Sequence, residues 1–151
     1  MTYEVMNEDH IPFLAPIYAE SFNAAPWNDN WTVDSAAKRL AQMFHCEGSY
    51  GLISYNNNNN NNNNEISGLI LGNHEIYYDC MHFNIKEFCI NQNMRGSGIG
   101  SILLNEFERR LIEMGIREIY LFTTRTIQTE GFYQKKGYVT NQDIIRMDKI
   151  I

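Results

Sequence analysis

The chain has 151 residues, 44% of them hydrophobic and 20% charged, with a formal net charge of -6 at pH 7. This length fits one domain that builds its own core, so we expect a single domain over residues 1–151. The acidic balance, without clustered Lys and Arg, excludes a general nucleic-acid surface. No apolar run of about 18 residues predicts a membrane span, and Glu4, Glu8 and Asp9 are unlike the start of a signal peptide. We expect a cytoplasmic protein that binds neither nucleic acid nor a membrane.

The cysteine spacing indicates neither a disulfide framework nor a metal centre. The chain has three cysteines, Cys46, Cys80 and Cys89, so they cannot all pair within it. None belongs to a C-x-x-C pair, and none lies near clustered histidines. We interpret all three as reduced core thiols.

Hydrophobic periodicity predicts the first elements. Residues 2–6 form a short strand, and a helix follows with Pro12 in its first turn and Pro16 inside it. After a loop at residues 23–31, Thr32 is a suitable N-cap for a second helix. The expected inward-facing residues are Ile11, Leu14, Ala15, Tyr18 and Phe22 in the first helix, and Val33, Ala36, Ala37, Leu40 and Phe44 in the second.

Nine consecutive asparagines, Asn56 to Asn64, separate two predicted strands at residues 49–55 and 65–71. A run of asparagine cannot bury apolar area to offset its ordering entropy. We predict a mobile loop at a hairpin tip. The alternative is a tract that aggregates or binds a partner.

The rest of the chain alternates predicted strands and helices. The strands cover Glu75–Tyr78, Phe83–Ile90, Glu118–Thr123 and Ile144–Ile150, and the helices cover Gly98–Met114 and Ile127–Lys136. Gly115 and Gly137 are suitable residues to end these two helices. Mostly consecutive strands followed by alternating elements indicate an α/β or α+β sandwich.

The most distinctive motif is Arg95-Gly96-Ser97-Gly98-Ile99-Gly100, between a predicted strand and a predicted helix. Glycines let the backbone approach an anion, and a helix start offers unpaired N–H groups and a positive dipole end. The motif therefore predicts a phosphate site. Its spacing is neither the G-x-G-x-x-G of dinucleotide-binding folds nor a P-loop, which ends in Gly-Lys-Ser/Thr.

A second motif, Gly131-Phe132-Tyr133-Gln134-Lys135-Lys136-Gly137-Tyr138, follows in the last predicted helix. In order and spacing the two motifs resemble those of the GCN5-related N-acetyltransferase (GNAT) superfamily, which uses acetyl-coenzyme A (acetyl-CoA). The resemblance is best over residues 83–151. It implies a mixed, mostly antiparallel sheet of about six to seven strands flanked by about four helices.

The resemblance also implies which residues bind coenzyme A. Backbone N–H groups of the loop would hold the pyrophosphate at the start of the long helix, and the preceding strand would pair with the pantetheine arm. The loop residues are Arg95, Gly96, Ser97, Gly98, Ile99, Gly100 and Ser101, and the strand residues are Phe88, Cys89 and Ile90. Family members often carry an Asn where this chain has Thr126, whose hydroxyl is expected to contact the cofactor instead. They also carry a small residue where this chain has Glu130.

Two residues are candidates for proton transfer. Tyr133 matches the family's general acid, which returns a proton to the departing thiolate. The alternative is that Tyr133 is only a core aromatic, which is the role expected for Phe132. Glu87 is the candidate general base, and the alternative is a solvated or salt-bridged strand residue. Asp79 and His82 are weaker options for the base.

Acceptor choice in the superfamily lies mainly in the first two helices and their connecting loop. Trp27, Asp29 and Trp31 are the candidate substrate-binding residues, and the alternative for each tryptophan is packing of the loop against the domain. Asp29 and Glu87 favour a cationic amine.

The sequence thus predicts an acetyl-CoA-dependent N-acetyltransferase that transfers the acetyl group directly to a primary amine of a small molecule. No metal is expected in the reaction. The alternatives are a coenzyme A-binding module without catalysis and a protein or peptide acetyltransferase. A homodimer is an expectation by family analogy.

Overall fold

The computed structural model describes residues 1–57 and 64–151. The strands are β1 (Thr2–Val5), β2 (Ser49–Asn57), β3 (Asn64–Ile76), β4 (Met81–Ile90) and β5 (Glu118–Leu121). The helices are α1 (Ile11–Asn23), α2 (Val33–Phe44), α3 (Ile99–Glu113) and α4 (Glu130–Gln134), with short 3-10 turns at Glu8–His10 and Gln92–Met94. The chain divides into two compact units, Met1–Leu121 and Phe122–Ile151, and each is described by itself.

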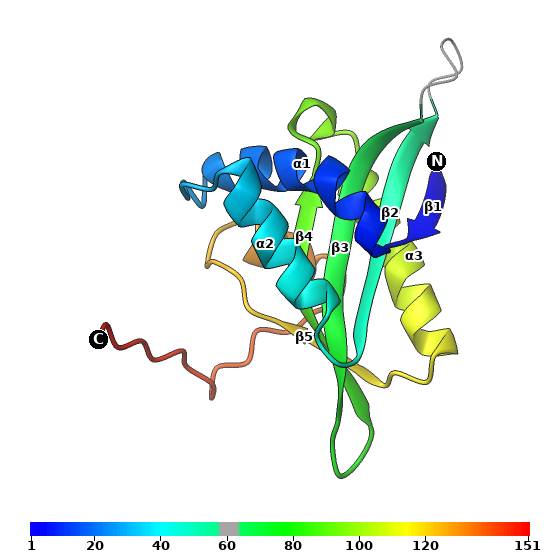
Figure 1. The fold of residues 1–151 in the computed structure, drawn as a ribbon. Helices are drawn as coiled ribbons and strands as arrows, with labels where there is room; N and C mark the ends of the chain where they lie inside the picture. Colours follow the sequence, from blue (N-terminus) through cyan, green and yellow to red (C-terminus); the bar gives the residue numbers. More distant parts are fainter. Residues whose placement is uncertain (58–63) are drawn as a thin grey trace. The chain divides into compact units, whose positions relative to one another are not determined.

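The first unit is built on one sheet whose strands lie in the order β1-β2-β3-β4-β5 (Figure 1). The first four strands pair antiparallel, and β5 pairs parallel to β4. The parallel pair needs a crossover, and α3 provides it. This is the mixed, mostly antiparallel sheet that the family resemblance implies.

Both faces of the sheet are covered in this unit. Ile53, Leu69 and Leu71 share a core cluster with residues of α1 and α2. On the opposite face, the ring of Phe83 packs edge-on against Phe107 of α3, with 5.4 Å between centroids. Figure 1 shows α1 and α2 together over one face of the central strands. A sheet covered on both faces accounts for the long apolar runs in β2 and β3.

Local sequence signals place the helix ends. Thr32 and Ser35 form a reciprocal capping box at the start of α2. Gly98 is the N-cap of α3 with φ of 81°, and Gly115 follows the helix with φ of 86°. The expected core residues of α1 are all buried, and Pro16 is accommodated inside the helix. In α2 the expectation holds for Ala36 and Leu40 but is wrong for Val33, which is exposed at the start of the helix.

Several sequence-based expectations are corrected. In the described residues the sheet has five strands, fewer than the expected six to seven. The separate strand predicted at residues 75–78 does not exist, because β3 runs unbroken to Ile76 and a turn follows. Residues 144–150 form no strand, and the helix predicted over residues 127–136 shortens to α4. Short apolar runs do not by themselves distinguish a strand from extended coil.

The asparagine tract and the cysteines also differ from expectation. The loop was predicted over Asn56 to Asn64, but Asn56 and Asn57 belong to β2 and Asn64 to β3; its remaining residues, 58–63, lie outside the described residues. All three cysteines are free, but only Cys89 is in the core; Cys46 is exposed and Cys80 is half-buried.

None of the helices within residues 1–57 and 64–151 is long and apolar enough to cross a membrane.

Candidate functional site

The glycine loop joins the end of β4 to the start of α3. Gly96 and Gly98 both have φ near 80°, a left-handed conformation that favours glycine. A Cβ added at either position would meet no described atom within 4 Å, so conformation rather than crowding requires glycine there. The loop can therefore turn its backbone without placing a side chain over the start of the helix.

The start of α3 has the features of an anion site. Its N-cap, Gly98, offers no side chain to the helix, and the first turn contains no acidic residue. The first N–H groups of a helix have no intrahelical acceptor, and the dipole makes this end positive. The backbone from Gly98 to Ser101 can thus bind a phosphate group.

Polar contacts tie the loop to the rest of the first unit. Arg95 Nη2 donates a hydrogen bond to the Ser21 carbonyl at 3.1 Å, and Gln92 Nε2 donates to the Glu20 carbonyl at 2.8 Å. Asn91 Nδ2 donates to the Ile66 carbonyl at 3.1 Å. The Arg95 guanidinium therefore anchors the loop to α1.

A β-bulge in β4 reverses the faces of the sheet to which odd- and even-numbered side chains point in the second half of the strand. Leu71 pairs with Glu87 and Gly72 pairs with Ile85, so Lys86 is an extra residue in β4. Before the bulge, Phe83 faces α3; after it, Glu87 faces α1 and α2. Regular alternation would have put these two odd-numbered residues on the same face.

The strands approach closely beside this bulge. A Cβ on Gly72 would lie 1.9 Å from the Asn84 carbonyl oxygen and 2.7 Å from Phe83 Cε1. Only glycine permits this approach. The close packing of the two strands therefore accounts for glycine at position 72, independently of any ligand.

Glu87 lies at the centre of a buried polar cluster. Its residue exposure is only 6%. The Tyr18 hydroxyl donates to Glu87 Oε2 at 3.0 Å, and Arg39 donates to Glu87 Oε1 from Nε at 3.1 Å and from Nη2 at 2.9 Å. The salt-bridged arrangement that sequence analysis left open is present. The role of Glu87 as a general base stays a prediction.

The electrostatics of this cluster are set mainly by burial. Burial raises the pKa of Glu87, the Arg39 guanidinium and the Tyr18 hydroxyl oppose the rise, and the charge of Asp29 adds to it. Burial, followed by the charge of Glu87, raises the pKa of Tyr18. A carboxylate with a raised pKa accepts a proton more readily than one in water.

The loop between α1 and α2 packs beside this cluster. Trp31 contacts the Tyr18 ring edge-on at 5.2 Å, and Trp27 contacts the Phe22 ring in the same way at 5.2 Å. Trp31 Nε1 donates to Asp29 Oδ2 at 2.9 Å. Both tryptophans are half-buried against the core, as the packing interpretation predicts, and Trp31 also brings Asp29 close to the Glu87 cluster.

The segment Phe88 to Ile90 follows Glu87 on β4. The parallel ladder between β4 and β5 ends at Ile85 and Leu121, before this segment begins. The Ile90 carbonyl accepts a hydrogen bond from Ser21 Oγ at 3.3 Å. Burial raises the pKa of the Cys89 thiol to about 12, so this side chain stays protonated near neutral pH and is not a thiolate nucleophile.

The second unit carries α4 and its surrounding loops. Tyr133 makes ring contacts with Phe132 at 5.1 Å and Tyr138 at 5.4 Å, and burial raises its pKa. A phenol in this state keeps its proton near neutral pH, as a general acid must before it acts.

The Thr126 hydroxyl is used inside the same unit. Its Oγ1 accepts from the Thr129 N–H at 3.2 Å and lies 2.8 Å from the Thr129 hydroxyl. Thr126 therefore supports the turn that begins α4. Its predicted cofactor contact stays a prediction.

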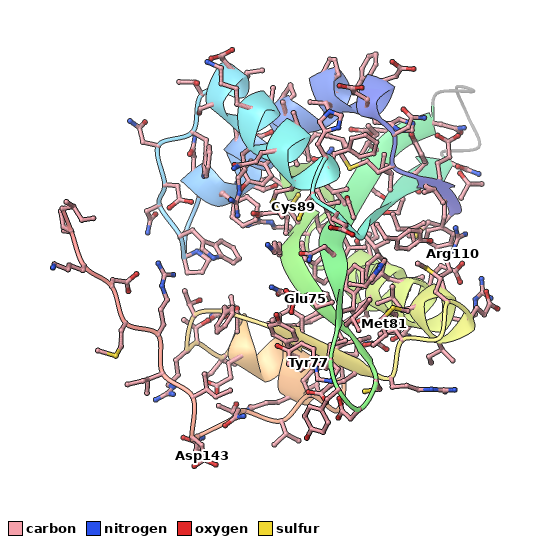
Figure 2. All side chains as sticks on the ribbon, turned by 60° about the horizontal axis from the view of Figure 1, so that its bottom comes forward. Glu75, Tyr77, Met81, Cys89, Arg110 and Asp143 are labelled. Carbon is pink, nitrogen blue, oxygen red and sulfur yellow. The ribbon has the colours of Figure 1, made fainter. Side chains whose placement is uncertain are left out.

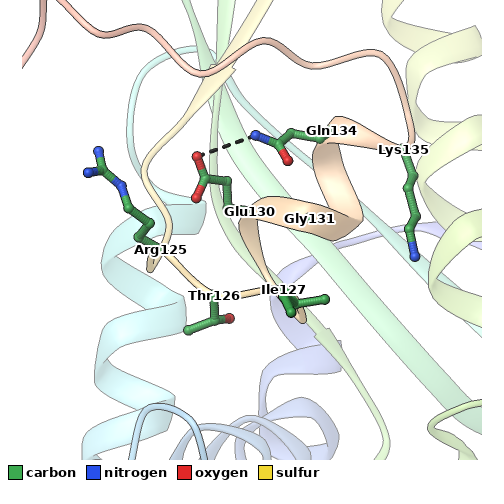
Figure 3. Close-up of a pocket in the computed structure, with 7 residues that line it drawn as sticks. All are labelled: Arg125, Thr126, Ile127, Glu130, Gly131, Gln134 and Lys135. Atoms are coloured by element: carbon green, nitrogen blue, oxygen red, sulfur yellow. Dashed lines mark hydrogen bonds between the residues drawn. The ribbon is translucent and has the colours of Figure 1, made fainter.

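A pocket lies on the second unit around α4 (Figure 3). Its lining residues are Arg125, Thr126, Ile127, Glu130, Gly131, Gln134 and Lys135. Glu130 accepts hydrogen bonds from Thr140 Oγ1 at 2.6 Å and from Gln134 Nε2 at 3.4 Å. Its carboxylate is thus held by side chains of its own unit, and Glu130 also lines the pocket.

The family assignment follows from comparison with known proteins. The family model of the acetyltransferase (GNAT) domain matches residues 17–151. The chain belongs to the GNAT family. It is therefore a GNAT-family N-acetyltransferase, and members of this family generally use acetyl-CoA. No curated protein matches the sequence significantly.

Solved structures of the same fold agree with this GNAT assignment. A possible acetyltransferase from Clostridium difficile 630 has a TM-score of 0.80 at 12% identity, covering 99% of this chain and 97% of its own. A GNAT family acetyltransferase from Staphylococcus aureus has a TM-score of 0.71 at 17% identity, covering 98% of both chains. An aminoglycoside acetyltransferase from an uncultured soil metagenomic sample, in complex with sisomicin, has a TM-score of 0.72 at 15% identity, covering 99% and 95%. At these identities the likeness shows the fold alone.

Sequence reasoning missed two members of the GNAT protein's buried cluster. Tyr18 was expected only as a core residue of α1. Arg39 belongs to no sequence motif and was not predicted to have a role in the site. Both contact Glu87 across large sequence separations. The weaker base candidates Asp79 and His82 lie instead at the opposite end of β4 from the glycine loop.

Proposed function

We propose that this protein transfers the acetyl group of acetyl-CoA directly to a primary amine of a small, cationic molecule. The observation that carries the proposal is the acidic pair Glu87 and Asp29 beside Trp31, on the α1 and α2 face of β4. Arg39 neutralises one of these two charges, so the pair retains net negative charge. Net negative charge at the exposed Asp29 and the buried Glu87 favours a positively charged acceptor.

The donor half of the proposal rests on the glycine loop. The N–H groups between Gly96 and Ser101 would bind the pyrophosphate, because the loop and helix start provide donors and a positive dipole. The backbone of Phe88 to Ile90 would bind the pantetheine arm. Acetyl-CoA supplies the activated acyl group, and the chain orients it.

The acceptor half rests on proton transfer. An alkyl amine is protonated near pH 7 and must lose a proton before it attacks. Glu87 is the proposed acceptor of this proton, directly or through water, and Tyr18 and Arg39 hold its carboxylate in place. Tyr133 is the proposed donor to the departing thiolate, a role taken from the family motif.

Thiol release from acetyl-CoA, measured with a panel of diamines, aminoglycosides, neutral amines and peptides, tests the proposal. We expect release with cationic small amines, and Tyr133→Phe and Glu87→Gln to lower kcat by about a hundredfold or more. Coenzyme A binding, measured by calorimetry, should stay unchanged. Tyr78→Phe is the matched control, since its side chain is fully exposed.

Three results would contradict the proposal. Tight coenzyme A binding without release for any amine would indicate a non-catalytic binding module. Release only with peptides would indicate a protein acetyltransferase. Unchanged kcat in Glu87→Gln would remove Glu87 from proton transfer and leave it a structural ion-pair residue.

A further inference from the structure

The turn between β3 and β4 gathers side chains that the acetyl-transfer chemistry does not use. The Tyr77 N–H donates to the Cys80 carbonyl at 3.1 Å and closes the turn. Figure 2 shows Tyr77 and Met81 at the end of the β3–β4 hairpin away from Cys89. The turn is therefore remote, within the first unit, from the strand end that leads to the glycine loop.

Three possible metal ligands meet at this turn. The ligand atoms of Asp79, Cys80 and His82 all lie within 4.8 Å of one another. His82 Nε2 lies 3.4 Å from Asp79 Oδ1 and 3.5 Å from Glu118 Oε2. Ligand atoms around a tetrahedral zinc ion with ordinary bond lengths lie about 3.3 to 3.7 Å apart. The two separations measured from His82 fall in this range.

His82 provides an observation independent of the spacing. The residue is only 8% exposed, and its Nε2 is buried without a hydrogen-bond partner among the described residues. A buried ring nitrogen that lacks a partner is unfavourable unless something binds it. Both neighbouring carboxylates lie close, yet neither makes a hydrogen bond to it. The nitrogen is thus oriented into a cluster of anionic groups with its bonding capacity unused.

The surrounding structure holds the cluster in place. The Tyr77 ring stacks on the His82 ring, with centroids 4.0 Å apart and planes 12° apart. The Cys80 N–H donates to Asp79 Oδ1 at 2.8 Å and orients that carboxylate. His82 and Glu118 are partners in the β4–β5 ladder, so their side chains extend from the same row of the sheet.

We propose that Asp79, Cys80 and His82 bind a zinc-type divalent cation, with Glu118 as the fourth ligand. A sulfur, a ring nitrogen and carboxylate oxygens form the mixed donor set that zinc accepts. The ion would join the β3–β4 turn to the start of β5 and would offset two of the three negative charges on the Cys80 thiolate and the two carboxylates. Its role is structural, so the expectation that acetyl transfer needs no metal is unaffected.

Titration of the metal-free full-length protein with Co2+ and Zn2+ tests this site. Co2+ bound to a thiolate gives a sulfur-to-metal charge-transfer band and intense visible bands in tetrahedral coordination. We expect one Co2+ per chain with these bands, displacement by Zn2+, and a higher thermal midpoint with Zn2+ because the ion binds the folded state.

Matched variants distinguish this site from other cysteines and histidines. Cys80→Ser should abolish the charge-transfer band, and Asp79→Asn and His82→Gln should weaken Zn2+ binding about tenfold or more. Cys46→Ser and His45→Gln should bind as the parent does, since these residues lie at the end of α2. Asp79 is exposed, so Asp79→Asn is expected to fold even if the substitution of buried His82 does not.

The proposal is overturned if neither metal binds more tightly than about 1 mM. It is also overturned if Cys80→Ser and Asp79→Asn bind Co2+ as the parent does. In either case the cluster is an ion-pair arrangement of His82 with Asp79 and Glu118. Acetyl-transfer activity does not enter this readout, so the two proposals fail independently.

Discussion

The Tyr18 hydroxyl donates a hydrogen bond to Glu87 Oε2 at 3.0 Å and so connects α1 to the buried end of β4. The same carboxylate receives two hydrogen bonds from Arg39 of α2. One buried acidic residue thus holds together both helices of one face and the strand that leads to the glycine loop. Its partners determine both its position and its affinity for a proton.

Removing the hydroxyl should test this connection directly. Tyr18→Phe leaves the buried Glu87 carboxylate with one donor fewer, and we expect a loss of about 1–3 kcal/mol in the free energy of unfolding. Urea denaturation measures the loss. Tyr78→Phe, at a fully exposed tyrosine, should change the same quantity by less than about 0.5 kcal/mol. Equal effects in the two variants would show that the hydrogen bond contributes nothing.

Glu87 should also give the protein a specific pH dependence. Burial raises its folded-state pKa, whereas the unfolded value is about 4.3. The folded state therefore binds the extra proton, and the stability from Glu87 is complete below about pH 4 and is lost as the pH rises through the folded pKa.

Denaturation of the parent and of Glu87→Gln across the range pH 4 to 8 measures this contribution. The difference in unfolding free energy, parent minus variant, should fall with rising pH. A difference that instead rises with pH would mean that Arg39 outweighs burial and that the folded pKa is lowered.

Gly98 should be sensitive to substitution for conformational reasons. Gly98 has φ of 81° and open space where a Cβ would lie, so Gly98→Ala introduces only backbone strain. We expect this strain to lower the free energy of unfolding by about 1–2 kcal/mol. Gly98→Asn should lower the free energy of unfolding by less, because asparagine tolerates the left-handed region better than alanine does. Thermal denaturation compares the two. If alanine and asparagine cost the same, strain is not the reason for glycine at this N-cap.

Gly72 should be sensitive for a steric reason instead. Gly72→Ala places a methyl group 1.9 Å from the Asn84 carbonyl oxygen, so the strands must separate. We expect the free energy of unfolding, measured by urea denaturation, to fall by about 3 kcal/mol or more. Gly131→Ala is the control, since its nearest neighbour lies at 3.7 Å and its φ is not positive. A mild effect at Gly72 would show that the β3–β4 pair beside the bulge is easily deformed.

Elements with a strong local signal were predicted correctly from the sequence. The N-cap at Thr32, the helix after Gly98 and its end at Gly115 depend on neighbouring residues, and all three are confirmed. The strand predicted at Ile144–Ile150 was wrong. Its apolar composition suited a strand, but strand formation needs a pairing partner that composition does not supply.

The sequence by itself determined the family and the position of the glycine loop at a helix start, because the glycines, the helix start and the aromatic motif are local patterns. Phosphate binding by this loop stays a prediction. Only the tertiary structure decided the surroundings of Glu87. A single extra residue, Lys86, turns it to the α1 and α2 face, and its partners Tyr18 and Arg39 lie 69 and 48 residues away along the chain. Burial and charge at that carboxylate come from groups brought together by packing, and no local pattern records them.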